Sequence, residues 1–373
     1  MKWVFWMSTA FIAYTYFGYA GWLWLRKRLR PQPVKSASYT PLISIVMVVQ
    51  NEAPVLRRKL TNLLTLDYPV DRFELIVVSD GSEDGSNKIL AEYAKDPRVR
   101  TIISPAVRGK AAGLNEATAV ACGELVVFTD ARQYIEPRAV RLLAENFADP
   151  DVGCVSGELM LGNAQTGETA EGMGLYWRME KQIRELESAS GSVVGATGAI
   201  YTARRKFLVP VPTGTILDDL FIPMNVVRQG ARVVFEPMAR AWDSPDLGRE
   251  REFARKVRTL SGNYQLLQLA PWLLSRENPI RFEFVSHKLL RLAAPFALAA
   301  VLVASFLLPQ PVYKFAFWLQ VAFYALSVLA MVRLTRGPLA RAADAVLTFV
   351  VLNTAAAVAF ANFVTGRKAV WIR

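Results

Sequence analysis

The stretch ISIVMVV at residues 43–49 decides which fold the sequence predicts. Short, nearly continuous apolar runs rich in β-branched residues recur at 74–79, 100–104 and 124–129. Such runs are typical of parallel strands that are buried on both faces of a sheet. Helical patterns lie between them, at 54–66, 85–94 and 110–121. The alternation predicts an α/β fold with a parallel sheet and right-handed βαβ crossovers.

Polar residues follow each of the four predicted strands. They are Gln50–Glu52, Asp80–Ser86, Arg108–Lys110 and Asp130–Arg132. In open sheets of this kind, ligands bind beyond the carboxyl ends of the strands. Each segment alone could be a helix cap or a turn, but four on one edge favour a nucleotide or sugar-phosphate site. No GxGxxG motif follows the first strand and no P-loop motif occurs in the chain, which disfavours the standard dinucleotide and P-loop sites.

The second half of the soluble region adds a glycine-rich loop, an acidic helix start and a basic helix. GATGA at 195–199 precedes a predicted strand, and Asp218 and Asp219 open a helix, where the helix dipole stabilises carboxylates. Alone, this acidic pair could simply cap the helix. The basic helix 249–269 places Arg251, Arg255 and Arg258 on one face. These guanidinium groups could contact lipid headgroups or neutralise a diphosphate leaving group.

Apolar segments flank this soluble region. Residues 3–25 carry no charge and precede the basic run 26–30, which predicts an N-terminal transmembrane anchor at 1–30 rather than a cleaved signal peptide. Runs at 289–308, 315–332 and 342–364 predict a C-terminal transmembrane region, 285–373, of about three helices. An interfacial segment is expected at 266–284. The chain is thus predicted to be a multi-pass protein of a bacterial-type inner (plasma) membrane, with its soluble domain in the cytoplasm.

Composition excludes several classes of protein. The chain has 373 residues, a net charge of +12, two cysteines and a single histidine, His287. One histidine excludes the usual zinc-ligand clusters and nearly excludes a Ser-His-Asp triad, and we expect His287 to lie at the membrane interface without a functional role. No basic–aromatic pattern indicates nucleic acid, so the positive charge is attributed mainly to the predicted spans.

The ordered motifs resemble those of the membrane-embedded family 2 glycosyltransferases, which include cellulose, chitin, hyaluronan and poly-N-acetylglucosamine synthases. The resemblance covers residues 41–265 and implies the GT-A fold, a Rossmann-like domain for nucleotide-diphosphate sugars. By the family's motifs, Asp219 is the catalytic base with Asp218 beside it, and Thr197 and Gly198 lie on the acceptor side. Residues expected to bind the donor are Asn51, Glu52, Asp80, Lys110, Asp130, Arg255 and Arg258. Asp130 would also hold a divalent metal, Mg²⁺ or Mn²⁺.

The sequence departs from the family pattern at three motifs. Arg132 replaces the second acid of the DxD element, so fewer anionic ligands face the metal. Asp218 shortens the middle acid of the TED triplet. Arg255 and Thr259 replace the glutamine and tryptophan of the QxxRW element. Loss of that tryptophan leaves simple sugar transfer implied but puts processive polymerisation in doubt.

The resemblance implies an inverting transfer from a nucleotide sugar, UDP-linked, to a polysaccharide or lipid-linked acceptor at the inner membrane face. The expected partners are the lipid bilayer and a second copy of the chain or an export partner. The alternative is a catalytically silent membrane regulator that binds nucleotide sugars, or an assembly subunit.

Overall fold

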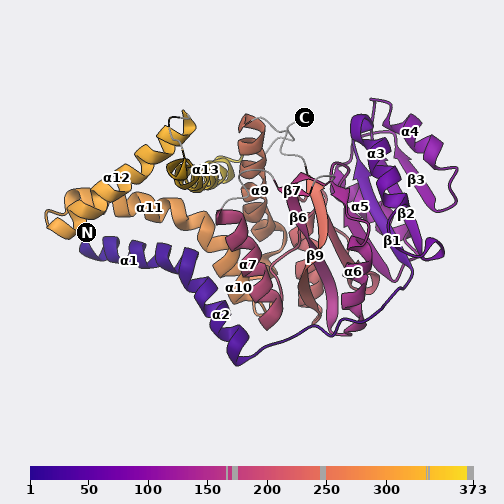
Figure 1. Cartoon of the computed structure of the whole chain (residues 1–373), viewed down its shortest axis with the longest axis horizontal. Coiled ribbons are helices and arrows are strands. Elements are labelled where there is room, and N and C mark those ends of the chain that lie inside the picture. The colour runs from indigo at the N-terminus through magenta and orange to yellow at the C-terminus, as the bar shows by residue number, and fades with distance from the viewer. Residues whose placement is uncertain (165–166, 170–174, 244–248, 333, 335–336, 368–373) are drawn as a thin grey trace.

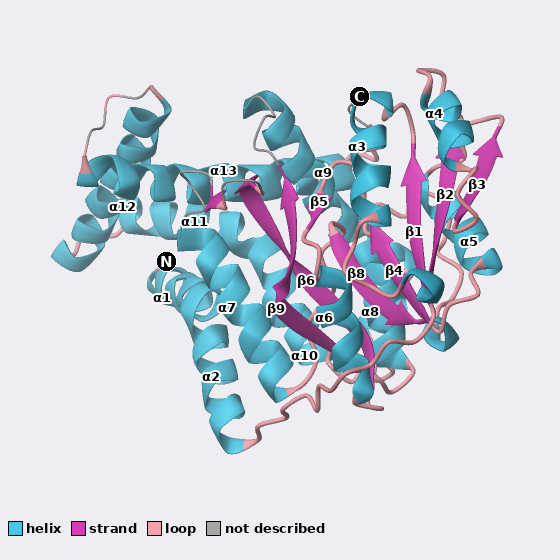
Figure 2. Cartoon of the chain, turned by 45° about the vertical axis from the view of Figure 1, so that its right-hand side comes forward, coloured by secondary structure: helices cyan, strands magenta, loops and turns pink. Residues whose placement is uncertain are grey.

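The computed structural model of the chain describes residues 1–164, 167–169, 175–243, 249–332, 334 and 337–367. A nine-stranded sheet has the order β3-β2-β1-β4-β8-β6-β9-β5, with β7 paired to β6 (Figures 1 and 2). The strands are β1 (Ile43–Val49), β2 (Phe73–Asp80), β3 (Val99–Ser104), β4 (Leu125–Thr129), β5 (Tyr134–Ile135), β6 (Val152–Asn163), β7 (Glu168–Thr169), β8 (Ile200–Arg204) and β9 (Arg232–Asp243).

The sheet is mixed, whereas the sequence predicted a parallel one. β1 pairs in parallel with β2 and β4, and β2 with β3, as expected. β8 runs antiparallel to both its neighbours, β4 and β6. All five residues of β8 are buried, because both faces of the sheet are covered. Its apolar pattern is therefore the same as that of a buried parallel strand, and strand direction could not be read from it.

Alternation along the strands separates two cores. Ile43, Ile45 and Met47 of β1 pack on one face with α3 (Ala53–Leu64), α4 (Ser86–Tyr93) and α6 (Ala139–Glu145). Val46 faces the opposite core, which α5 (Lys110–Val120), α8 (Asp218–Arg228) and α9 (Arg249–Leu269) cover. Successive side chains of a strand point to opposite faces, so a strand covered on both sides is apolar at nearly every position.

Three helices of the described residues are long and apolar enough to cross a membrane: Arg281–Leu307, Pro311–Met331 and Leu339–Val364. They correspond to α10 (Arg281–Phe284) with α11 (Leu290–Leu307), to α12 (Pro311–Met331) and to α13 (Pro338–Val364). The N-terminal α1 (Lys2–Ala13) and α2 (Tyr19–Leu29) are not among the three, so the anchor at 1–30 stays a prediction. α1 nevertheless lies along α11 (Figure 1), and Phe5 packs against Tyr313 with ring centroids 4.8 Å apart. Residues 368–373 of the predicted membrane region lie outside the described residues.

Two helices connect the sheet to the apolar helices. α7 (Leu175–Ser190) and α9 lie between them (Figure 1). Ile183 and Leu186 of α7 pack against Tyr19 of α2. On α9, Tyr264 stacks on Phe363 of α13 with ring centroids 5.0 Å apart. The sheet and the apolar helices are thus in direct contact through buried side chains.

Candidate active site

Lys110 is the centre of the candidate site. It begins α5, and its Nζ lies 3.0 Å from Asp130 Oδ1 and 3.1 Å from Asp218 Oδ2. Asp130 follows β4 directly, and Asp218 begins α8. Three segments that are far apart in the sequence therefore meet at one ammonium group.

Asp219 and Asp130 approach each other at Gly198. The backbone N–H of Gly198 donates a hydrogen bond of 3.0 Å to Asp219 Oδ2. A Cβ atom at this glycine would lie 3.2 Å from Asp219 Oδ2 and 3.5 Å from Asp130 Oδ2. Thr197 holds the same loop, because its backbone N–H donates to Ser156 Oγ at 3.1 Å. The glycine leaves the space between the two acids free of a side chain.

The site acids and Lys110 shift one another's pKa values. Burial, and then the charge of Asp218, raise the pKa of Asp219 to about 6, while Lys110 opposes the shift. Burial alone would lower the pKa of the Lys110 ammonium, but Asp130 and Asp218 raise it well above its usual range. Asp219 therefore has a pKa suited to accepting a proton near neutral pH, and Lys110 stays charged.

Of the two predicted arginines, Arg258 is the one whose charge interacts with these acids. Burial lowers the pKa of its guanidinium, and the charges of the three site acids oppose this shift. Arg255 instead pairs with Glu252 at 3.1 Å and lies 3.9 Å from Asp243. Its role as a donor ligand stays a prediction that these contacts do not support.

Asp80 fixes the loop that carries Lys110. Its two carboxylate oxygens accept hydrogen bonds of 2.8 Å from the backbone N–H groups of Arg108 and Gly109. Gly81, next to it, has φ of 62°, and a Cβ there would lie 2.6 Å from the backbone nitrogen of Val107. A glycine is thus required at position 81, because the loop after β2 and the loop that carries Val107 approach each other closely. Direct binding of the donor by Asp80 stays a prediction.

Asn51 and Glu52 line the edge of the site after β1. Asn51 has φ of 55°, a conformation that asparagine tolerates, and its Oδ1 accepts a hydrogen bond of 2.8 Å from Glu83 N. Glu52 Oε1 lies 3.4 Å from Nε of Arg132. Burial raises the pKa of Glu52, and Arg132 opposes this. The arginine that replaces the second acid therefore has an acidic partner within the chain.

Lys59 is a residue of this region that the sequence analysis missed. It is fully buried on α3, and its Nζ donates hydrogen bonds of 2.8 Å to Thr129 Oγ1 and to the carbonyl oxygen of Gln133. Burial lowers its pKa to about 7, against the charge of Asp130. Lys59 thereby holds the loop that presents Asp130. Its position among the leucines on the buried face of α3 was a signal in the sequence, because a lysine at such a position needs a partner.

The surroundings of Asp130 decide how a divalent cation fits this site. In the described part of the chain, no group of three or more His, Cys, Asp or Glu side chains could hold a metal ion. Asp130 presents one oxygen to Lys110 and the other toward Gly198. Mg²⁺ is commonly bound by one or two carboxylates together with substrate phosphates. The residues therefore fit a cation that Asp130 and a diphosphate hold jointly.

Comparison with known proteins identifies this domain. Residues 44–209 match the family model described as glycosyl transferase family 2. This segment is similar to family 2 glycosyltransferases. The match confirms the resemblance proposed from the motifs and supports the predicted enzyme class, a glycosyltransferase.

Two relatives and one solved structure give further comparisons. The chain is 24% identical over 254 residues to poly-beta-1,6-N-acetyl-D-glucosamine synthase of Staphylococcus aureus (strain COL), covering 65% of this chain and 60% of the relative. It is 26% identical over 241 residues to the synthase of Staphylococcus epidermidis, covering 62% of this chain and 56% of the relative. The chain thus spans about 60% of the length of these relatives. The mannosyltransferase PcManGT from Pyrobaculum calidifontis has a similar fold, with a TM-score of 0.73, 23% identity and coverage of 98% of this chain and 100% of that chain. The predicted GT-A fold is confirmed.

Proposed function

We propose that this protein is an inverting glycosyltransferase that moves a sugar from a nucleotide-diphosphate sugar, UDP-linked, to a polysaccharide or lipid-linked acceptor at the cytoplasmic face of a membrane. The contact of Lys110 with both Asp130 and Asp218 is the observation that carries the proposal. This contact supports a role for the Lys110 ammonium group toward the diphosphate, next to a half-buried carboxylate, Asp219, that would accept a proton.

In the proposed reaction, the acceptor oxygen attacks the anomeric carbon while the bond from that carbon to the diphosphate oxygen breaks. Asp219 accepts the proton of the acceptor hydroxyl, and with a pKa of about 6 it is ionised at neutral pH. Negative charge develops on the departing diphosphate, where Lys110 and Arg258 neutralise it. A single displacement inverts the configuration at the anomeric carbon, so an α-linked donor gives a β-linked product.

Asp130 would hold the divalent cation, Mg²⁺ or Mn²⁺. When bound, such a cation stabilises the charge of the departing diphosphate as a Lewis acid. The structural relative PcManGT is described in complex with GDP-Man and Mn²⁺, which supports this part of the proposal. Since Arg132 stands where the family carries a second acid, the cation would depend on the diphosphate for most of its other ligands.

The three apolar helices support attachment to a membrane, and the basic run at residues 26–30 supports a cytoplasmic catalytic domain. The name of the staphylococcal relatives supports a polysaccharide product. A product of this kind must cross the membrane, so a second copy or an export partner would complete the path.

The test is a screen of UDP- and GDP-sugars with the purified full-length protein, with detection of the released nucleoside diphosphate and mass analysis of the product. Asp219→Asn should lower the transfer rate about 10²–10⁴-fold and leave the affinity for the donor within a few fold. Asp71→Asn, at an exposed carboxylate (83% exposed side chain), is the control and should leave both unchanged. Transfer at the wild-type rate by Asp219→Asn would refute the assignment.

A silent nucleotide-sugar-binding regulator is the second candidate, which Arg132 and Thr259 favour because they replace an acid and an aromatic residue of the family. Calorimetry separates the two. Donor binding without turnover, with every sugar and cation tested, would support the regulator.

A further inference from the structure

Arg132 is a charged residue at the edge of the active site to which the proposed reaction gives no role. It lies in the loop after β4, two residues from Asp130. β1 is the parallel neighbour of β4 (Figure 2), and Glu52 follows β1 at the same edge of the sheet. Nε of Arg132 lies 3.4 Å from Oε1 of Glu52. The Arg132 side chain therefore extends from the end of β4 toward the end of β1, along the edge where such sheets bind ligands.

The backbone that carries Arg132 is held in place by two consecutive residues of α3. Nη2 of Arg58 donates a hydrogen bond of 3.0 Å to the carbonyl oxygen of Arg132. Nζ of Lys59 donates a hydrogen bond of 2.8 Å to the carbonyl oxygen of the next residue, Gln133. Lys59 is buried, so this second contact belongs to the core of the domain. The fold thus sets the point from which the Arg132 side chain leaves the backbone.

The guanidinium group of Arg132 keeps most of its donors for a ligand. The side chain is 55% exposed, and its 3.4 Å contact with Glu52 is longer than an ordinary hydrogen bond. In the described part of the chain, Glu52 is the one polar partner of this side chain. A guanidinium has five N–H donors arranged as a planar fork. Since Glu52 faces Nε, the two Nη groups stay available to a second anion.

Lys110, by contrast, is already engaged by two carboxylates. Its Nζ lies 3.0 Å from Asp130 and 3.1 Å from Asp218, and its side chain is 22% exposed. To contact a diphosphate, Lys110 must share its donors with these acids or leave one of them. Arg132 has to break no hydrogen bond to do the same. A phosphate that enters beside Asp130 therefore meets Arg132 as the more accessible of these two cations.

From these contacts we propose that Arg132 binds the diphosphate of the nucleotide sugar directly, so that the nucleotide also binds without a divalent cation. This inference rests on the proposed glycosyltransferase function and adds a donor-binding residue to it. Arginine is always charged and binds phosphate oxygens in a bidentate manner. Glu52 would orient the guanidinium through Nε, and the Nη groups would hold the phosphate. Arg132 thus supplies part of the positive charge that the diphosphate needs.

The experiment is calorimetric titration of UDP, and of uridine as a ligand without phosphate, into the full-length protein in detergent. Each titration is made with EDTA and with excess Mn²⁺. Wild type should bind UDP in EDTA, and more tightly than uridine. Arg132→Met should weaken UDP binding in EDTA at least about tenfold, because hydrogen bonds between charged groups are lost, and should leave uridine binding unchanged. Arg132→Lys keeps the charge without the bidentate geometry, so its affinity for UDP should lie between the two.

Arg72→Met is the matched control. The Arg72 side chain is 57% exposed and lies 3.8 Å from one carboxylate, that of Asp71, but it precedes β2 and so lies at the opposite edge of the sheet. Its affinity for UDP should equal that of wild type. Equal affinities of wild type and Arg132→Met for UDP in EDTA, an equal loss of UDP and uridine binding, or wild-type binding of UDP only with Mn²⁺ would overturn the inference. In each of these cases, binding of UDP with Mn²⁺ would still support the proposed function, whereas no binding of UDP under either condition would contradict both.

Discussion

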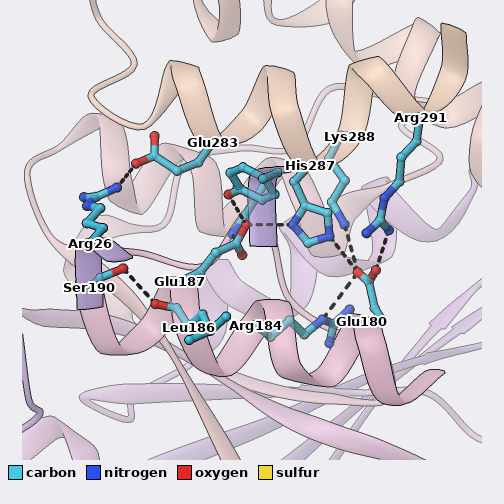
Figure 3. A network of polar contacts seen from close by, with 12 residues as sticks. Arg26, Glu180, Arg184, Leu186, Glu187, Ser190, Glu283, His287, Lys288 and Arg291 are labelled. Carbon is cyan, nitrogen blue, oxygen red and sulfur yellow. Dashed lines mark hydrogen bonds and ion pairs between the residues drawn. The ribbon is translucent and has the colours of Figure 1, made fainter. Parts of the chain in front are cut away.

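The active site and a buried cluster of His287, Glu180 and Glu187 (Figure 3) are alike in one respect, because in each a nitrogen-bearing side chain lies between two carboxylates. In the active site, Lys110 lies 3.0 Å from Asp130 and 3.1 Å from Asp218. In the cluster, His287 lies 2.8 Å from both Glu180 and Glu187. In the active site the three groups come from three segments far apart in the sequence, whereas Glu180 and Glu187 both belong to α7 and only His287 comes from a distant segment.

The two regions differ in their access to solvent. The side chain of Asp130 is 41% exposed, whereas that of His287 is 0% exposed. A substrate can therefore reach the active-site pairs and exchange one partner for another. The His287 contacts are buried between α7 and the segment Val285–Leu289 that precedes α11, beside Tyr19 of α2, and they link the sheet domain to the apolar helices. We infer that such contacts serve catalysis in the active site, which solvent can reach, and that around the buried His287 they stabilise the packing of the sheet domain on the apolar helices.

The largest expected effect is on catalysis, from Lys110→Met. The substitution removes the cation that faces the diphosphate and leaves Asp130 and Asp218 without their partner. We expect kcat/KM for sugar transfer to fall about 10²–10³-fold. Lys88→Met, at an exposed lysine of α4, should have no effect. A fall of less than threefold for Lys110→Met would show that the ion pairs of Lys110 with Asp130 and Asp218 take no part in the reaction.

The next effect is on stability, from Glu187→Gln. The amide has nearly the same shape but removes the buried negative charge that accepts hydrogen bonds from Tyr19 Oη and Val194 N and lies 2.8 Å from His287. Hydrogen bonds to a charged group contribute about 1.5–3 kcal/mol each, so thermal unfolding in detergent should occur at clearly lower temperature. Glu185→Gln changes an exposed residue of the same helix and should leave the unfolding temperature unchanged. If the two variants unfold alike, the contacts of Glu187 do not stabilise the packing of the sheet domain on the apolar helices.

The smallest effect is expected from Arg132→Asp, which tests whether Asp130 is a ligand of the divalent cation. The substitution restores a second carboxylate near Asp130. Because added anionic ligands strengthen binding of hard cations, the Mn²⁺ concentration for half-maximal binding in the presence of UDP should fall about tenfold. Electron paramagnetic resonance of Mn²⁺ measures this without turnover. Unchanged or weaker Mn²⁺ binding would argue against Asp130 as the metal ligand.

The active site could largely be predicted from the sequence, because most of its residues directly follow predicted strands. Parallel strands end at a common edge, so the strand pattern alone predicts that Lys110 and Asp130 are neighbours. The motif order then added Asp218 and Asp219. The loop-fixing contacts of Asp80 were not predicted, since they depend on backbone groups of Arg108 and Gly109 that no pattern marks.

The contacts of His287 with Glu180 and Glu187 could not be predicted, and the expectation that His287 lies at the membrane interface without a functional role stays a prediction. Glu180 and Glu187 are seven residues apart on α7, which places them on one face of that helix. Nothing in their sequence indicates which helix packs on that face. The contacts form only when α7 packs against the segment that precedes α11. The antiparallel direction of β8 could not be predicted either, because a strand buried on both faces has the same apolar pattern in both directions.

The central claim is that Asp219 is the catalytic base and that burial and Asp218 set its pKa. The most direct test is the pH dependence of kcat between pH 5 and 8 for the wild type and Asp218→Asn. For the wild type, kcat should rise with pH through an apparent pKa of about 6 and then level off, because the base acts when ionised. In Asp218→Asn the rise should move to lower pH, since a neighbouring negative charge is lost. A wild-type profile that is flat over this range, or a rise that Asp218→Asn leaves in place, would contradict the account.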